Sequence, residues 1–484
     1  MSIYILARLI ANLVVLRLAA NKAFVFSYTF FLKIWKPLDF LERIEYNDGV
    51  RNQPNSKEDQ SMRAAFYETE ITPPLGGMMW GHYSDLRAKD VQDKLYVKAA
   101  VIEEGGELSA TVCVDSCAMP PQMHDIVTKR IQEYTGIDPS RVCVTSNHTH
   151  WGASFSDSPE LNSFADDAYR DVCFRLAADA VILAYKRLSD VEATVANTEM
   201  IGYSFCRDYV MEDGSVITHG KSPMAVKGQL AEVDPDVWVV MFRRNGEPIG
   251  AFINYANHQC CCGKIEAYTG DYSSILSKEL KKIYGPDFVS LFLLGTCGDI
   301  NHINNDRVTK ATPDTYREIG RALAAKTVEA LKTERPIGTG LTVKKELIRI
   351  PARVIDSDGL RAALDDMLHK EGSTMRIRNL VHYHATNKSD YRDLWIQAIK
   401  LGNTCIWCMP GEVFVDFGRR LKNESKFENN FVVELCNSYC GYIPTPRAFG
   451  EKCDLYETSL CHHSCLIPEA GDMIVDRMLE MMGS

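Results

Sequence analysis

The sequence predicts an α/β fold of the mixed α+β kind, with a mixed β-sheet core, hairpins and flanking helices. Strand-like segments occur in pairs around two-residue turn signals, and amphipathic helical segments alternate with them. No long linker, low-complexity tract or internal repeat follows Met62. Hairpins give antiparallel neighbours, whereas strand–helix–strand units give parallel ones, so we expect both kinds of pairing in the sheet.

Three hairpins are predicted from turns that contain glycine. Gly, Asn and Asp tolerate the positive φ angles that tight two-residue hairpin turns require. The expected strands are 95–103 with 108–115 around Gly105-Gly106, and 237–244 with 249–255 around Asn245-Gly246. The third hairpin turns at Asp213-Gly214.

Three helices are predicted from apolar spacing and end signals. Segment 121–134 ends before Gly136, and segment 273–284 ends before Gly285. Thr312-Pro313 reads as a cap followed by proline at the first helical position of a helix that runs to about residue 331.

Composition excludes some classes of function and organisation. A net charge of -10 leaves no basic stripe to neutralise phosphates, so we expect no nucleic-acid partner. The 16 cysteines do not suggest a disulfide framework, because three are consecutive at 260–262 and others lie in apolar strand-like runs. A reducing cytoplasm is therefore the expected location.

Residues 1–61 differ from the region 62–484, which we expect to form one folded domain. Segment 1–36 carries basic but no acidic residues, and its uncharged runs are too short for a transmembrane span. We expect a disordered leader or a translation artefact upstream of a true start at Met62. Membrane-surface association or organelle targeting through residues 1–36 is the alternative.

Four side chains that bind metals well each follow a predicted strand. His148 follows strand 142–144, His258 follows 251–255, Glu412 follows 404–408, and Tyr442 follows 431–435. Strand ends on a rigid sheet can bring distant side chains to one point. A few N and O ligands with one open position are what metal-assisted hydrolysis requires, so the four residues are candidate ligands.

Each candidate also has an ordinary explanation. His148 and His150 lie on the same side of an extended segment, where His150 would act as a proton carrier, or both belong to a solvated loop. Glu412 would cap a helix over 413–421. The glycines of the stretch 294–301 would let its backbone approach a ligand, with Asp299 and Asn301 as candidate substrate-binding residues and Asp299 orienting a histidine, or the stretch is only a tight turn. Cys461-His462-His463-Ser464-Cys465 reads as a closing loop rather than a second zinc site.

Taken together and in order, the motifs resemble those of the neutral/alkaline non-lysosomal ceramidase family, in its N-terminal catalytic domain. The resemblance spans roughly residue 66 to the C-terminus. The matching stretches are Glu70-Ile71-Thr72-Pro73-Pro74, Asn147-His148-Thr149-His150, Asn257-His258, Gly270-Asp271-Tyr272, Gly298-Asp299-Ile300-Asn301, Pro410-Gly411-Glu412 and Tyr442-Ile443-Pro444-Thr445.

The resemblance implies zinc-dependent hydrolysis of an N-acyl amide bond. It implies one Zn²⁺ per chain, held by His148, His258, Glu412 and Tyr442. His150 matches the second active-site histidine, near the scissile amide, and would shuttle a proton to the leaving amine. Tyr442 would also stabilise the oxyanion, and Arg207 matches a substrate-contacting arginine.

Because the sequence departs from the family pattern, the resemblance does not determine the substrate. Trp151 replaces a small residue after His150 and would narrow the entrance. The family's C-terminal immunoglobulin-like domain is expected to be absent, so we expect a short relative that acts on a lipid-like or small N-acyl substrate. The alternatives are a hydrolase of a smaller, more polar N-acyl or ester substrate, and a non-catalytic binding protein on the same scaffold. The oligomeric state is not predicted.

Overall fold

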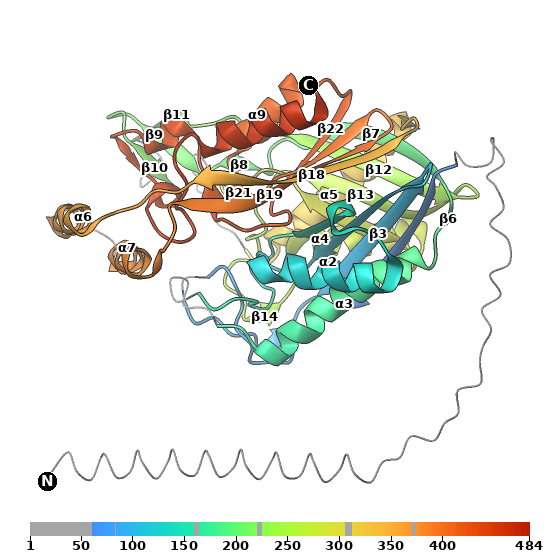
Figure 1. Cartoon of the computed structure of the whole chain (residues 1–484), viewed down its shortest axis with the longest axis horizontal. Helices are drawn as coiled ribbons and strands as arrows, with labels where there is room; N and C mark the ends of the chain where they lie inside the picture. The colour runs from blue at the N-terminus through green and yellow to red at the C-terminus, as the bar shows by residue number, and fades with distance from the viewer. Residues whose placement is uncertain (1–60, 83, 159–163, 220–224, 305–311, 370–373) are drawn as a thin grey trace, which may run out of the picture. The chain divides into compact units, whose positions relative to one another are not determined.

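Three mixed β-sheets carry the fold in the computed structural model, and helices pack on their outer faces (Figure 1). The structure describes residues 61–484 except 83, 159–163, 220–224, 305–311 and 370–373. These residues belong to one compact unit, 55–484. The predictions for residues 1–60 lie outside the described residues. No helix in the described part of the chain is long and apolar enough to cross a membrane.

The first sheet has the strand order β5-β4-β3-β1-β6 and carries helices α2 and α3. Its elements are β1 (Arg63–Glu70), β3 (Tyr96–Glu104), β4 (Glu107–Val114), β5 (Val142–Ser146), β6 (Ser189–Asp190), α2 (Pro121–Thr135) and α3 (Asp167–Tyr185).

The second sheet has the order β15-β13-β12-β7-β17 and carries α4 and α5. Its elements are β7 (Glu192–Glu199), β12 (Asp236–Arg244), β13 (Glu247–Tyr255), β15 (Val289–Leu294), β17 (Arg335–Pro336), α4 (Asp271–Tyr284) and α5 (Thr315–Ala330).

The third sheet has the order β18-β19-β20-β22 and carries α8 and α9. Its elements are β18 (Leu341–Pro351), β19 (Tyr391–Leu401), β20 (Thr404–Cys408), β22 (Asn429–Val433), α8 (Val415–Glu424) and α9 (Ala470–Met482). Helices α6 (Ser357–His369) and α7 (Thr374–Thr386) lie between β18 and β19 in the chain.

Short strands complete the described fold. The parallel pairs are β2 (Asp90–Val91) with β14 (Ala267–Tyr268) and β21 (Glu412–Val413) with β23 (Tyr442–Ile443), and β8 (Phe205–Cys206) pairs antiparallel with β16 (Ile300–Asn301). A small sheet contains β9 (Asp208–Met211), β10 (Val216–Thr218), β11 (Val226–Gln229) and β24 (Cys453–Asp454).

Strand residues alternate between a shared inner core and a helix-covered face. On β12, Val240 and Phe242 belong to the inner cluster that all three sheets share, whereas Val239 and Met241 belong to the cluster that includes the helices. The same two-residue period assigns Ile406 of β20 to the inner core and Trp407 to the cluster that contains α8 and α9. Because both faces are buried, the strands are apolar on both sides.

Each sheet combines a hairpin with one parallel pair. The parallel pairs are β4 with β5, β13 with β15, and β20 with β22, and helices α2, α4 and α8 connect them. The carboxyl ends of these pairs meet. Asn437, after β22, donates its backbone N–H to Val144 of β5, and Glu434 donates to Leu294 of β15. Loops that follow the parallel strands therefore face one region.

The predicted fold class and hairpins are confirmed. Gly105-Gly106 and Asn245-Gly246 have positive φ and join β3 to β4 and β12 to β13, and Gly214 turns between β9 and β10. Helices α2 and α4 match the predicted segments within two residues. The prediction for Pro313 is wrong. The hydroxyl of Thr312 accepts the N–H of Asp314 in a turn, and α5 starts only at Thr315.

We expect Gly411→Ala to destabilise the protein by at least about 2 kcal/mol, since a Cβ at φ +67° would be strained and would overlap the carbonyl oxygen of Gly441. Gly136→Ala is the matched control, because its φ is +76° but nothing lies within 4 Å of the added carbon. Urea unfolding should show the smaller loss for Gly136→Ala. Equal losses for the two variants would show that the crowding at Gly411 is unimportant.

Candidate metal centre

His148 is held in an unusual backbone conformation directly after β5. Its φ is +69°, and its N–H donates to the carbonyl of Ser116 at 2.9 Å. The preceding Asn147 donates its side-chain amide to Asp115 at 2.7 Å and to Ser273 at 2.9 Å. These buried contacts fix the turn and therefore the direction of the His148 ring.

His258 follows β13 in a loop that the start of α4 holds. Asp271 accepts the N–H groups of Cys261 at 2.8 Å and of Tyr272 at 2.6 Å. The Tyr272 hydroxyl donates to the carbonyl of Asn257. Burial raises the pKa of Asp271 to about 7, although these N–H groups oppose the rise. The stretch Gly270-Asp271-Tyr272 therefore fixes the loop that carries His258 and acts on the site only through that loop.

Glu412 and Tyr442 are direct neighbours in the short parallel pair β21 and β23. The Glu412 N–H donates to Gly441 at 2.8 Å, and the Tyr442 N–H donates to His463 at 2.9 Å. Glu412 does not cap α8, whose N-cap is Phe414. The ordinary explanation for this carboxylate is therefore wrong.

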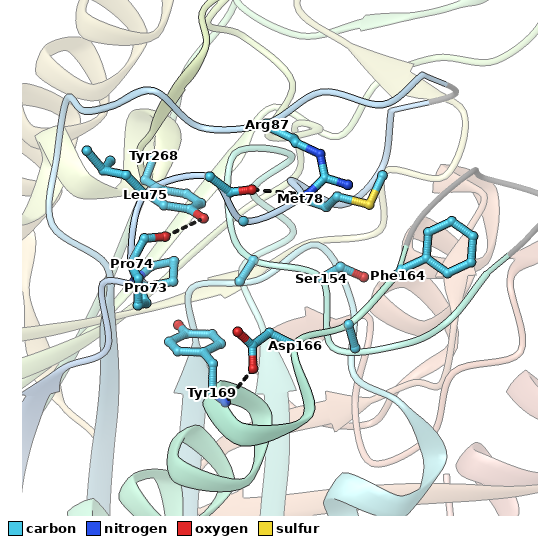
Figure 2. A pocket seen from close by; sticks show the side chains of 14 residues that line it. Pro73, Pro74, Leu75, Met78, Arg87, Ser154, Phe164, Asp166, Tyr169 and Tyr268 are labelled. Atoms are coloured by element: carbon cyan, nitrogen blue, oxygen red, sulfur yellow. Dashed lines mark hydrogen bonds between the residues drawn. The ribbon is translucent and has the colours of Figure 1, made fainter. Parts of the chain in front are cut away.

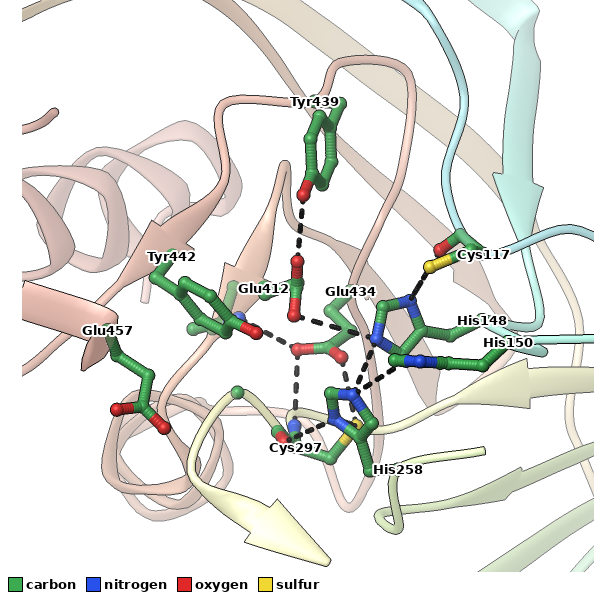
Figure 3. Close-up of polar contacts among 12 residues, drawn as sticks. Cys117, His148, His150, His258, Cys297, Glu412, Glu434, Tyr439, Tyr442 and Glu457 are labelled. Carbon is green, nitrogen blue, oxygen red and sulfur yellow. Dashed lines mark hydrogen bonds and ion pairs between the residues drawn. The ribbon is translucent and has the colours of Figure 1, made fainter. Parts of the chain in front are cut away.

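Three of the four candidate ligands, which are His148, His258 and Glu412, converge on one buried point (Figure 3). Nε2 of His148 lies 2.9 Å from Nε2 of His258 and 3.5 Å from Oε2 of Glu412. Ligand atoms of these three residues all lie within 4.8 Å of one another. Figure 3 shows the Tyr442 ring beside Glu412, on the side away from the histidines.

The donor atoms fit a cation at this point. Nδ1 of His148 faces the carbonyl of Cys117, and Nδ1 of His258 faces that of Cys297 at 3.3 Å, so both Nδ1 atoms carry the proton. In neutral rings the two Nε2 lone pairs then face each other. Oε2 of Glu412 is buried and accepts no hydrogen bond. Two imidazoles and a carboxylate with free lone pairs are a donor set that suits zinc.

The pKa shifts of Glu412 and His148 also indicate that positive charge is favoured at this point. Burial favours the neutral form of Glu412, but His148 and the hydroxyls of Tyr439 and Tyr442 outweigh it and lower the pKa of Glu412 to about 2. Burial lowers the pKa of His148, yet Cys117 and Glu412 raise it further, so the net shift is upward. Burial, and then the charge of His148, hold the pKa of His258 and His150 well below the ordinary value.

Comparison with solved structures identifies the fold. No protein-family model and no curated protein matches the sequence. Neutral ceramidase from Pseudomonas aeruginosa matches with a TM-score of 0.67 at 18% identity, over 88% of this chain and 74% of that one. A ceramidase complexed with C2 matches with a TM-score of 0.68 at 17% identity, over 87% and 75%. The chain has the neutral ceramidase fold. The resemblance predicted from the sequence motifs is confirmed at this level.

In this ceramidase fold, His150 lies beside the candidate ligands. Its Nε2 is 3.0 Å from Nε2 of His258, and its carbonyl accepts a hydrogen bond from His82 at 2.8 Å. The Tyr442 hydroxyl lies 3.3 Å from that of Tyr456. Both predicted catalytic side chains therefore adjoin the ligand cluster, and their catalytic roles stay predictions.

The predicted substrate-contacting residues have structural partners. Arg207 is buried, pairs with Glu457 at 2.8 Å, and places its guanidinium 5.7 Å from the Tyr442 ring centroid. Trp151 is buried and donates its indole N–H to Ile265 at 3.1 Å. Its ring is thus part of the core, which gives no support to a narrowed entrance.

Asp299 and Asn301 lie at the turn after β15. Asp299 accepts the N–H of Val415 at 2.8 Å, so this contact holds the first turn of α8 rather than a histidine ring. Asn301 accepts the N–H of Ile303 at 2.6 Å. Binding of substrate by either residue stays a prediction.

Several site residues were not predicted from the sequence. Tyr439 donates its hydroxyl to Oε1 of Glu412 at 2.8 Å. Glu434 is fully buried and accepts the N–H groups of Cys297 at 3.1 Å and Val413 at 2.8 Å. Burial raises the pKa of Glu434 to about 8. Glu434 could have been predicted as a site residue, because it is a lone acidic residue at the end of an apolar strand. No feature of the sequence indicates Tyr439.

The structure gives residues of the Cys461–Cys465 stretch other partners. In the described part of the chain, none of its residues belongs to a group whose ligand atoms lie close enough for one ion. Instead, His462 bonds the Thr386 hydroxyl at 2.6 Å, and the carbonyl of His463 supports Tyr442. The stretch packs against the metal centre from outside.

A cavity of about 360 Å³ lies beside the loop 73–78 (Figure 2). Its wall is formed by the loop 73–78, by Ala153 and Ser154, and by the start of α3. Apolar side chains such as Leu75 and Phe164 alternate there with Arg87 and Asp166. The cavity can therefore take a partly apolar molecule with a polar end.

We expect Tyr439→Phe to lower zinc affinity about 10- to 100-fold, because the lost hydroxyl orients the Glu412 carboxylate. Tyr134→Phe, at an exposed tyrosine of α2, is the control and should bind as the unaltered chain does. Titration against a competing chelator measures both. Unchanged affinity in Tyr439→Phe would contradict the role of this hydroxyl.

We expect Asp271→Asn to remove a pH-dependent loss of stability. The folded-state pKa of about 7 exceeds the unfolded value of about 3.9, so the free energy of unfolding falls as pH rises from about 4 to 7 and levels off above that. Asparagine tolerates the φ of +54° and does not titrate. Urea unfolding of metal-free protein should show a flatter curve for the variant, by at most about 4 kcal/mol. Parallel curves would refute the shift.

Proposed function

We propose that this chain is a zinc-dependent hydrolase of an N-acyl amide bond, as the names of its structural neighbours suggest. The observation that carries the proposal is the meeting of His148, His258 and Glu412 around one point, with Tyr442 beside Glu412. Zinc bound there would polarise an acyl carbonyl and make a water molecule acidic. The free lone pairs of the two rings and of Glu412 support an ion at this place.

The neighbouring side chains suit the remaining steps. His150 is neutral near pH 7 because burial and His148 lower its pKa, so its Nε2 can take a proton from water and return it to the leaving amine nitrogen. The Tyr442 hydroxyl can donate to the carbonyl oxygen as negative charge develops on it. Tyr439 keeps the Glu412 carboxylate turned toward the rings.

The substrate is an N-acyl amine, with N-acyl sphingosine as the first compound to test. The neighbours named as ceramidases suggest this compound. A smaller, more polar N-acyl or ester compound is the second candidate. Hydrolysis of fluorogenic N-acyl amines with short, medium and long chains separates the two.

We expect His148→Ala to lose both zinc and activity, and His150→Ala to keep zinc while its rate falls about 100- to 10,000-fold. His382→Ala, on α7, is the control and should retain both. The measurements are elemental analysis of purified protein and hydrolysis of a short-chain N-acyl sphingosine.

The outcomes distinguish the alternatives. Full zinc content in His148→Ala would show that the ligand assignment is wrong. Stoichiometric zinc in the unaltered chain without hydrolysis of any compound in the panel would favour a binding protein on this scaffold.

A further inference from the structure

Three buried cysteines meet behind the candidate metal centre. Cys143 lies in β5, Cys408 is the last residue of β20, and Cys436 follows β22. Their sulfur atoms all lie within 4.8 Å of one another, and the sulfurs of Cys143 and Cys408 are 3.6 Å apart. Each side chain is at most 1% exposed.

The spacing suits three thiolates around one ion. Metal–sulfur bonds of about 2.3 Å place the sulfurs about 3.8 Å apart in the tetrahedral geometry usual for zinc, and about 4 Å apart in a trigonal plane. The Cys143–Cys408 distance of 3.6 Å and the limit of 4.8 Å on the other two pairs are compatible with these values, whereas a disulfide requires about 2.05 Å. Thiolate sulfur selects soft ions over the hard cations that carboxylates bind.

A partly buried ammonium group lies next to the cluster. Nζ of Lys345 donates to the carbonyl of Val142 at 2.7 Å and to the Asn437 side chain at 3.2 Å, and these residues adjoin Cys143 and Cys436. Nζ also contacts Nε2 of His124 at 2.7 Å. Within the described residues, no carboxylate makes an ion pair with Lys345.

The charges of an ionised cluster would balance. Three thiolates carry three negative charges, and a divalent ion with Lys345 supplies three positive ones. Lys345 also has Asp125 in its surroundings, whose carboxylate contacts Nδ1 of His124 at 2.9 Å, and its Nζ lies 5.5 Å from the Trp395 ring centroid. Burial lowers the pKa of Lys345, and the three sulfurs oppose that fall.

We propose that Cys143, Cys408 and Cys436 form a second metal site, which takes a soft divalent d¹⁰ cation such as zinc. The ion would tie together the strand ends that lead to His148, Glu412 and Tyr442, which lie five, four and six residues further along the chain. Its role is structural, and it does not depend on hydrolysis at the catalytic centre.

The test uses cadmium as the probe in a full-length chain that carries His148→Ala and His258→Ala, so that the first centre is removed. Under reducing conditions we expect one cadmium per chain and a thiolate-to-cadmium charge-transfer absorption in the near ultraviolet. Adding Cys143→Ala should abolish the absorption. Adding Cys405→Ala should not, because this buried cysteine of β20 belongs to the core cluster on the opposite face of the sheet.

A measurement on the unaltered chain covers the case in which Cys143→Ala fails to fold, which circular dichroism would reveal. Cadmium-113 NMR should show two resonances, one shifted as expected for three sulfur ligands. Absence of that resonance, or charge-transfer absorption that survives Cys143→Ala, would overturn the proposal.

Discussion

The geometry of the candidate centre depends on one buried carboxyl group, that of Glu434. This residue follows β22, and its side chain accepts hydrogen bonds from the backbone of Cys297 and Val413 and from the Cys297 thiol at 3.0 Å. Cys297 carries the carbonyl that orients His258, and Val413 follows Glu412. One group therefore sets the distance between a histidine of the second sheet and a carboxylate of the third. Buried N–H groups are costly to leave unpaired, which keeps this arrangement unique.

Charge is the second constraint on the region. Two imidazole rings whose Nδ1 atoms donate to carbonyls must present Nε2 lone pairs toward each other, and the Glu412 carboxylate adds negative charge. Without a cation, a proton on His148 relieves this repulsion, which agrees with the raised pKa of that ring. The fold thus holds its donors in a geometry that only positive charge makes favourable, as preorganised metal sites do.

Much of the fold and site was predictable because the signals were local. Turn residues set the hairpins at Gly105-Gly106 and Asn245-Gly246, and the ends of apolar strands located His148 and His258. Contacts between distant segments were not predictable. The sequence does not show that Asp299 bonds Val415, that Tyr439 reaches Glu412, or that Trp151 turns into the core. Each of these contacts depends on how the three sheets pack together. No short stretch of the sequence indicates that packing.

The joining of three sheets at the ends of their parallel pairs has a kinetic consequence. The Val144 N–H reaches the Asn437 side chain across 293 positions of sequence, so the contacts around the centre are among the most non-local in the chain. Closing such long loops costs entropy before any contact offsets it, and folding slows as contact order rises. The ligands come from all three sheets, so the full constellation forms only once the sheets have packed together, and an ion that needs all of the ligands binds only then. Metal uptake by refolding protein would thus report the last stage of assembly.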